Sequence, residues 1–190
     1  LNIIKSKNNP CVVVVSAVGG VTNLLNESSV LAEKGKKSYL NKVDLVEKKH
    51  LIIIKKLLSG SIKESAINDM KKLVSKLKKI LEGVFMIGER SIQTKDSILN
   101  FGELLSYQLL HSVAIQKNID AKKKNTEELI VTYSEKKNLI FDYEKTKFLV
   151  KSYFKKNKFK FLIVPGFVSK NSKNKPSNLG RGGSDLTASL

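Results

Sequence analysis

The stretch CVVVVSAVGGVTN at residues 11–23 decides the fold class of this 190-residue chain. Its four consecutive valines predict a buried β-strand that ends at Ser16, because β-branched residues pack well in sheets. Gly19 and Gly20 predict a tight turn after the strand, and a helical pattern begins at Thr22. A strand, a glycine turn and a helix in this order are typical of α/β proteins with a parallel sheet.

Two long amphipathic patterns follow this first unit. Apolar residues recur at spacings of three and four over residues 39–57 and again over residues 70–80. The segment SGS at 59–61 interrupts the pattern, so we predict a helical hairpin at about residues 39–82. His50 lies on the apolar face of this hairpin, where we expect a packed or hydrogen-bonded core histidine.

A third helix is predicted at about residues 95–116, with Thr94 as its N-cap. Glu103 is the only formally charged side chain between Asp96 and Lys117, and apolar residues occupy every side of the helix. We expect such a helix to be buried, and a buried carboxylate is costly unless it meets a cation or several donors. The pattern leaves two roles open for Glu103: binding a positively charged ligand, or a structural ion pair with a core lysine.

The second half of the chain alternates short apolar runs with one helical pattern. Strands are predicted at residues 119–122, 129–133 and 159–164. A helix is predicted at residues 143–155, before the last strand. The polar run SKNSKNKPSN at 169–178 predicts a surface loop. Ser184 or Asp185 is expected to cap a helix that starts at Leu186. The whole pattern predicts an α/β fold with a mostly parallel sheet.

The net charge of +18 raises the alternative of a nucleic-acid-binding module. Only two of the 35 basic residues are arginines, Arg90 and Arg181, whereas base recognition depends strongly on the arginine fork. The lysines are spread along predicted helix exteriors, with no interleaved aromatic residues that could stack on bases. This distribution favours a solvated surface, and we expect no nucleic-acid partner.

The length and the 41% hydrophobic content suffice for one domain over residues 1–190. Cys11 is the only cysteine, so it cannot form an internal disulfide and is expected to be a small buried residue. No apolar run approaches the length of a membrane helix, and the chain begins without a signal-peptide pattern. We therefore expect a cytoplasmic protein without membrane contact. Because Leu1 is not an initiator methionine, we also expect the chain to be a fragment.

Two glycine-bearing loops follow predicted strands, which is where ligands bind in open α/β sheets. They are SAVGGVTN at 16–23 and GRGGSD at 180–185, and successive glycines let backbone N–H groups approach an anion closely. Arg181 stands between two glycines, where its planar guanidinium can hold a carboxylate through two hydrogen bonds. If Glu103 faces the same cleft, the expected ligand is an amino acid, because it carries both a carboxylate and an amino group. Without a ligand, Glu103 and Arg181 can pair directly.

Four stretches resemble aspartokinases in type and order: SAVGGVTN (16–23), FGELLS (101–106), PGFVSKN (165–171) and LGRGGSDLTAS (179–189). The longer stretch GVFMIGERSIQTKDSILNFGELLS resembles the branch in which aspartokinase is joined to homoserine dehydrogenase. The resemblance implies the amino-acid kinase fold, a three-layer sandwich with a mostly parallel central sheet, here incomplete and carrying the helical hairpin. It also implies that residues 1–190 are part of an aspartokinase catalytic domain.

The implied reaction is ATP-dependent, Mg²⁺-assisted phosphorylation of the L-aspartate β-carboxylate, the first step towards lysine, threonine and methionine. By the resemblance, Arg181 would hold the α-carboxylate of aspartate, Glu103 its ammonium, and Asp185 would help to organise the catalytic centre. Further residues would line the substrate site, namely Ser16, Thr22, Phe167 and Ser184. Four glycines would form the phosphate-binding loops, namely Gly19, Gly20, Gly182 and Gly183. No residue is assigned as a metal ligand.

The chain also departs from the aspartokinase pattern. The family's N-terminal lysine and glycine motif has no counterpart before Cys11, and SIQTKD at 91–96 replaces a Ser-Pro-Arg-Thr type of segment. We therefore expect the isolated chain to be inactive, and the full-length protein to form a homo-oligomer. The alternatives are another small-molecule kinase of the same fold, a basic nucleic-acid-binding module, or a purely structural remnant.

Overall fold

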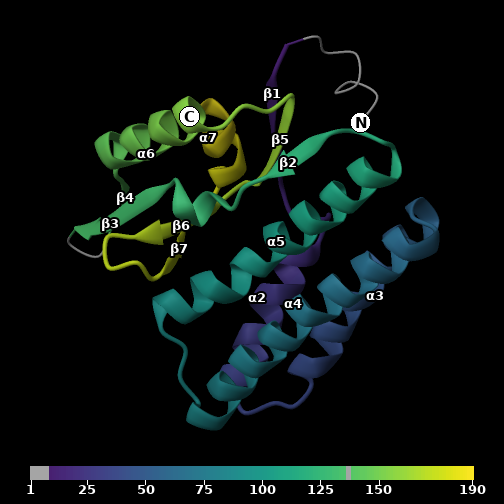
Figure 1. Ribbon diagram of the computed structural model, residues 1–190. Helices are drawn as coiled ribbons and strands as arrows, with labels where there is room; N and C mark the ends of the chain where they lie inside the picture. The colour runs from purple at the N-terminus through teal and green to yellow at the C-terminus, as the bar shows by residue number, and fades with distance from the viewer. Residues whose placement is uncertain (1–8, 136–137) are drawn as a thin grey trace.

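The computed structural model describes residues 9–135 and 138–190, and Figure 1 shows strands lying between two layers of helices. The helices are α2 (Val21–Glu33), α3 (Tyr39–Leu57), α4 (Gly60–Ile87), α5 (Ile92–Gln116), α6 (Tyr143–Lys156) and α7 (Gly183–Ser189), with a 3-10 turn η1 (Thr126–Glu128). The strands are β1 (Cys11–Val15), β2 (Ala121–Lys123), β3 (Val131–Glu135), β4 (Asn138–Phe141), β5 (Phe161–Pro165), β6 (Val168–Asn171) and β7 (Pro176–Asn178). Along the described part of the chain, no helix has the length and apolarity needed to cross a bilayer.

The strands form two small sheets. The first has the order β1-β5-β2, with both pairings parallel, and Val13 lies opposite Ile163 in its register. The second has the order β4-β3-β6-β7, in which β3 and β6 are parallel and the two hairpins antiparallel. The predicted α/β fold with a mostly parallel sheet is therefore confirmed.

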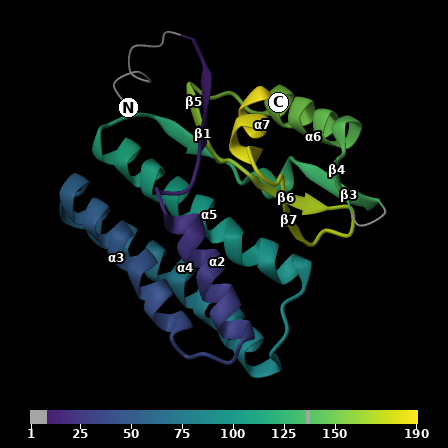
Figure 2. The ribbon, with the colours of Figure 1, turned by 180° about the vertical axis from the view of Figure 1, so that it is seen from behind.

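Helix α5 is the central element of the fold. It contacts α2 and α4 on one side and strands of both sheets on the other, as both views of the ribbon show (Figures 1 and 2). Its buried residues include Ile98, Phe101 and Leu105, which join the main apolar core. The predicted burial of this helix is thus correct. It explains why Glu103 is the only formally charged side chain between Asp96 and Lys117.

The predicted helical hairpin corresponds to α3 and α4, which pack against each other and against α2. His50 is fully buried in this region, and its Nδ1 donates a hydrogen bond to the Val46 carbonyl oxygen at 2.8 Å. The expectation of a hydrogen-bonded core histidine is correct. Desolvation by burial lowers the pKa of His50, so the ring is kept neutral.

The polar run at 169–178 is not a loop, contrary to the prediction. It forms the hairpin β6–β7, and the Asn171 side chain holds its turn by accepting from the backbone N–H groups of Lys173 and Lys175, each at 3.0 Å. Pairing of β6 with β3 fixes the first strand, and Ser177 in the second is buried. Tertiary pairing therefore outweighs the polar composition of the segment.

Two predicted helix caps were also wrong. Helix α5 starts one turn earlier than expected, because the hydroxyl of Ser91, not of Thr94, accepts the Thr94 backbone N–H at 3.1 Å. Helix α7 has no side-chain cap, and Gly182 precedes it in the left-handed conformation with φ 76°. Because the helix already begins at Gly183, Ser184 and Asp185 lie inside its first turn and cannot be its N-cap.

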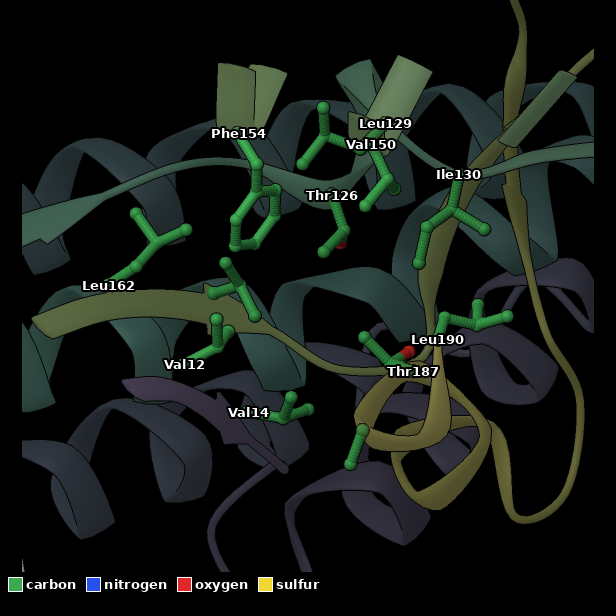
Figure 3. Close-up of a pocket in the computed structure, with 12 residues that line it drawn as sticks. Val12, Val14, Thr126, Leu129, Ile130, Val150, Phe154, Leu162, Thr187 and Leu190 are labelled. Atoms are coloured by element: carbon green, nitrogen blue, oxygen red, sulfur yellow. The ribbon is translucent and has the colours of Figure 1, made fainter. Parts of the chain in front are cut away.

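Strand β1 and Cys11 are half-buried instead of buried, contrary to the prediction. The strand pairs only with β5 among the described residues, so it is the edge of its sheet. Figure 3 shows the outer face of this sheet, where Val12, Phe154 and Leu190 lie around an apolar groove of about 360 Å³. Val12 is 41% exposed there, because α6 and α7 cover the face only in part.

Candidate active site

A polar cavity of about 320 Å³ lies where four distant segments of the chain meet. It is lined by the end of β1 and the start of α2 (Ser16, Ala17, Thr22), by Glu103 of α5, by Phe167 after β5, and by the loop and first turn of α7 (Gly180, Arg181, Gly182, Gly183, Ser184, Asp185). The first segment and Phe167 follow the carboxyl ends of the parallel strands β1 and β5, as expected for a ligand site in an α/β fold. The structure therefore brings the predicted substrate-site residues together.

Glu103 is the most unusual group in this cavity. Its side chain is only 6% exposed; Oε1 accepts the Ala17 backbone N–H at 3.3 Å, while the buried Oε2 has no hydrogen-bond partner among the described residues. Desolvation raises the pKa of Glu103 from 4.5 to about 7, and the Ala17 hydrogen bond offsets only part of that effect. A buried carboxylate with one unsatisfied oxygen can accept a hydrogen bond from a cationic ligand.

The alternative of a structural ion pair finds no support in the described ranges, 9–135 and 138–190. None of the ion pairs there includes Glu103 or Arg181, so the direct Glu103–Arg181 pair considered for an empty site is not formed either. The physical reason is that Arg181 is exposed on its loop, where water hydrates the guanidinium, while Glu103 is bonded to Ala17. The two opposite charges face one cavity without neutralising each other.

Close packing at Gly102 sets the position of Glu103. A Cβ added at Gly102 would lie 2.9 Å from the Ala17 Cβ and 3.4 Å from the Leu25 Cδ1, so α5 approaches the β1–α2 loop as closely as a helix can. Only glycine permits this approach, because any side chain would push the helix away. The contact explains why the carboxylate of the next residue reaches the backbone N–H of Ala17.

The turn after β5 places Phe167 in the cavity. Phe167 has φ 66°, and the Val168 N–H donates to the Gly166 carbonyl across it at 2.6 Å, as in a γ-turn. A Cβ at Gly166 would come within 2.9 Å of the Ser184 Cα, so this glycine lets α7 pack directly on the turn. Such backbone strain in a non-glycine residue persists only where surrounding contacts impose it.

The sequence interpretation missed two residues that hold the lining of the cavity in place, Thr187 and Ala17. The Thr187 hydroxyl accepts the Phe167 backbone N–H at 3.1 Å and donates to the Gly183 carbonyl at 2.8 Å, so it joins the γ-turn to α7. Ala17 bonds to Glu103 only through its backbone N–H. The position of Thr187, one helical turn after Gly183, was a usable signal, because hydroxyls commonly bond the carbonyl four residues earlier. Ala17 carries no such signal.

Gly19 and Gly20 lie between the lining residues Ala17 and Thr22 but do not themselves line the cavity. Gly20 precedes α2 with φ 79°, and the Gly19 carbonyl accepts a hydrogen bond from the Lys49 ammonium at 3.2 Å. Their predicted role in phosphate binding stays a prediction. The positive φ explains why a glycine stands at position 20 in any case.

Glu103 and Asp185 are the acidic residues that line the cavity, and Asp185 is exposed at the start of α7. No cluster of three or more metal-ligating side chains occurs within residues 9–135 and 138–190. This donor set fits Mg²⁺ that is bound mainly by phosphate oxygens and water, with one carboxylate from the protein, as is usual for nucleotide-bound magnesium.

Comparisons with known proteins place the chain in a family. The model of the family described as "Amino acid kinase family" matches residues 1–190. Bifunctional aspartokinase/homoserine dehydrogenase 2, chloroplastic, of Arabidopsis thaliana is 28% identical over 189 residues, which cover 99% of this chain and 21% of that protein. The chain thus spans about a fifth of the length of such curated relatives.

Two crystal structures of E. coli aspartokinase III share the fold. The complex with lysine and aspartate (T-state) has a TM-score of 0.84 at 22% identity, covering 98% of this chain and 41% of that chain. The complex with aspartate and ADP (R-state) has a TM-score of 0.83 at 25% identity, covering 98% and 40% respectively.

Proposed function

The chain belongs to the amino acid kinase family. From this membership we propose that it is part of an aspartokinase, which phosphorylates the β-carboxylate of L-aspartate with ATP. One observation carries the proposal: the cavity holds two groups of opposite ionic type, Glu103 and Arg181, and neither has an ion-pair partner in the described part of the chain. A free amino acid has the complementary pair of charges. The names of the similar proteins, and the aspartate in both E. coli structures, favour aspartate among amino acids.

In this proposal each charged residue has a distinct role. Arg181 would bind the α-carboxylate through its two-pronged guanidinium, and the Glu103 Oε2 would accept a hydrogen bond from the ammonium. The cavity of about 320 Å³ is at the lower end of ordinary ligand pockets, which suits a small substrate. Four residues would line the site without a charge, namely Ser16, Thr22, Phe167 and Ser184.

The chemical step transfers the γ-phosphoryl group of ATP. A β-carboxylate oxygen of aspartate forms a bond to the γ-phosphorus, the bond from that phosphorus to the β,γ-bridging oxygen breaks, and ADP leaves with the electron pair. The product is 4-phospho-L-aspartate. Mg²⁺ would supply charge neutralisation on the phosphates, and Asp185 together with the glycine loops (Gly19, Gly20, Gly182, Gly183) would position them.

The other predictions about the whole protein remain proposals. We propose that residues 1–190 are part of a catalytic domain, and that the enzyme works in the cytoplasm as a homo-oligomer with no nucleic-acid or membrane partner. The plant relatives bear chloroplastic names, so fractionation of the source cells is the direct test of location. Another small-molecule kinase of this fold is the second candidate, and it would need a different partner for Glu103.

The reaction is tested by trapping the acyl phosphate. Protein that carries these residues is incubated with ATP, Mg²⁺ and hydroxylamine, and aspartyl hydroxamate is measured with L-aspartate, L-glutamate or D-aspartate as the acceptor. We expect hydroxamate only with L-aspartate, and loss of product in Glu103→Ala. Equal product with L-glutamate would refute aspartate selectivity, and ATP-dependent phosphorylation of an acceptor that is not a carboxylate would favour the second candidate.

A further inference from the structure

Helix α5 carries a polar stripe that includes Glu103 in the cavity. Asp96, Asn100 and Glu103 are spaced by four and three residues, which places them on one face of the helix. Each makes a hydrogen bond to a residue outside the helix. Glu103 bonds to the β1–α2 loop as described above, whereas Asp96 and Asn100 both bond to the end of β7.

The contacts at β7 are short and largely buried. The Asn178 Nδ2 donates to the Asp96 Oδ1 at 2.7 Å, and the Asn100 Nδ2 donates to the Ser177 carbonyl at 3.0 Å. Asn178 is 6% exposed and Asn100 is 2% exposed, so water competes little for the Asn100 bond, whereas Asp96 is half-buried. Helix α5 is therefore fastened to β7 through side chains.

Asn178 also controls the start of the loop that bears Arg181. Its Oδ1 accepts the Gly180 backbone N–H at 3.0 Å, and Gly180 has φ 72°. The Asp96 carboxylate only accepts hydrogen bonds when ionised, so it selects the orientation of the Asn178 amide in which Nδ2 faces the helix. That orientation leaves Oδ1 facing Gly180. The donor and acceptor of one side chain thus join α5 to the glycine loop.

We propose that Asn178 is a positioning residue that holds the Arg181 loop in register with Glu103 on α5. The proposal rests on the proposed function, because the distance between these two charges matters only if one ligand bridges them. Glu103 lies two helical turns beyond Asp96, so a loop fastened to Asp96 has a fixed placement along the same helix face. Without the bond to Asn178, Arg181 would occupy many positions, and a bidentate grip on a carboxylate requires few.

The burial of Asp96 is consistent with this role. Desolvation raises the pKa of Asp96, and the hydrogen bond from Asn178 opposes that shift by stabilising the ionised carboxylate. Among the described residues the carboxylate has no ion-pair partner, so the amide is its principal support. Loss of Asn178 would therefore affect both the loop and the first turns of α5.

The test exchanges the two side chains. Asn178→Asp alone sets two carboxylates against each other, and Asn178→Ala removes both bonds. The double variant Asp96→Asn with Asn178→Asp restores them, because the carboxylate then at position 178 accepts from Gly180 and from the amide at position 96. Asn171→Ala is the matched control, since the Asn171 side chain also makes two hydrogen bonds, both accepted from backbone N–H groups, but lies at the far turn of the same hairpin.

Two measurements follow each variant: the KM values for aspartate and ATP, and hydrogen exchange of the amides at 180–183. We expect both single variants at position 178 to raise the aspartate KM, and to speed exchange at Gly180, by about tenfold. The ATP KM should rise less than the aspartate KM, because Gly182 and Gly183 are only two of the four glycines proposed to position the phosphates. The double variant should recover both readouts, and Asn171→Ala should change neither.

The outcomes separate this inference from the proposed function. Faster loop exchange with an unchanged aspartate KM would overturn a positioning role, as would a double variant no better than Asn178→Asp. A wild-type protein that does not phosphorylate aspartate would refute the proposed function instead. In that case rescue of Gly180 exchange by the double variant would still support Asn178 as the residue that positions the loop, and absence of rescue would refute it.

Discussion

The Glu103 carboxylate is bonded to the Ala17 backbone N–H through one oxygen, at 3.3 Å, and its other oxygen is buried without a partner among the described residues. This half-satisfied state accounts for its raised pKa of about 7, since one hydrogen bond does not replace the lost hydration. A ligand ammonium would supply the missing partner and favour ionisation. The same carboxyl therefore links substrate binding to pH.

The first prediction concerns catalysis. If ionised Glu103 binds the substrate ammonium, kcat/KM for aspartate should fall about tenfold per pH unit below an apparent pKa of about 7. Glu103→Gln should lower kcat/KM at high pH and remove this limb, because an amide does not titrate. The measurement is the pH profile of kcat/KM from pH 5.5 to 8.5 at saturating ATP. A wild-type profile that is flat through pH 6 would contradict the assignment.

The second prediction concerns the stability of the ligand-free protein. The pKa of Glu103 is raised on folding from 4.5 to about 7, so its protonated form favours the fold. That contribution, on the order of 3 kcal/mol, is fully present below pH 4.5 and is lost as pH rises through 7. Urea denaturation should show that Glu103→Gln reduces the loss of stability between pH 5 and pH 8. Parallel pH dependences in wild type and variant would refute it.

His50 should act in the opposite direction, which is the third prediction. Burial lowers its pKa in the folded protein below the ordinary 6.5, so its contribution is present above pH 6.5 and is lost as pH falls. We expect His50→Leu, which cannot titrate, to lose less stability than wild type between pH 7 and pH 5. The free energy of unfolding in urea at both pH values decides it. An equal loss in both proteins would show that a group other than His50 causes the pH dependence.

Local signals predicted much of this fold. The valine run after Cys11, the spacing of apolar residues in α3 and α4, and the absence of charge around Glu103 each reflect the environment of the segment that contains them. The gathering of Glu103 and Arg181 at one cavity was also predictable, because both neighbouring loops follow strand ends.

Other features depend on partners that are distant in sequence. The segment at 169–178 becomes a hairpin only because β3 and α5 offer hydrogen bonds to its polar side chains and backbone. The cap at Ser91 competes with Thr94 one turn away, and composition does not decide between two hydroxyls. The hydrogen bond from Ala17 to Glu103 uses only a backbone N–H, which every residue except proline possesses.

The fourth prediction uses the two arginines of the chain. Arg181→Lys should raise the aspartate KM roughly 10- to 100-fold, because an ammonium cannot form two parallel bonds to a carboxylate. Arg90→Lys is the control, since Arg90 bonds to Ser29 and Glu33 away from the cavity. We expect that variant to reduce stability and to leave the aspartate KM unchanged. Equal effects of the two variants on KM would remove Arg181 from the substrate site.

The last prediction compares two glycines inside helices. Gly102→Ala places a methyl group 2.9 Å from the Ala17 Cβ, so α5 must move away from the loop that donates to Glu103. Overpacking of this kind costs about 1–3 kcal/mol, which exceeds the gain of about 1 kcal/mol in helix propensity. Gly83→Ala in α4 meets nothing within 4 Å, so it should gain the propensity without the clash.

Urea denaturation and calorimetric titration with aspartate measure the two effects. Gly83→Ala should be more stable than wild type and bind aspartate equally well. Gly102→Ala should be less stable and bind aspartate more weakly, because displacement of α5 moves the Glu103 carboxylate relative to Arg181. A Gly102→Ala protein with unchanged affinity would show that the close contact with Ala17 serves packing alone, and that Glu103 reaches its ligand without it.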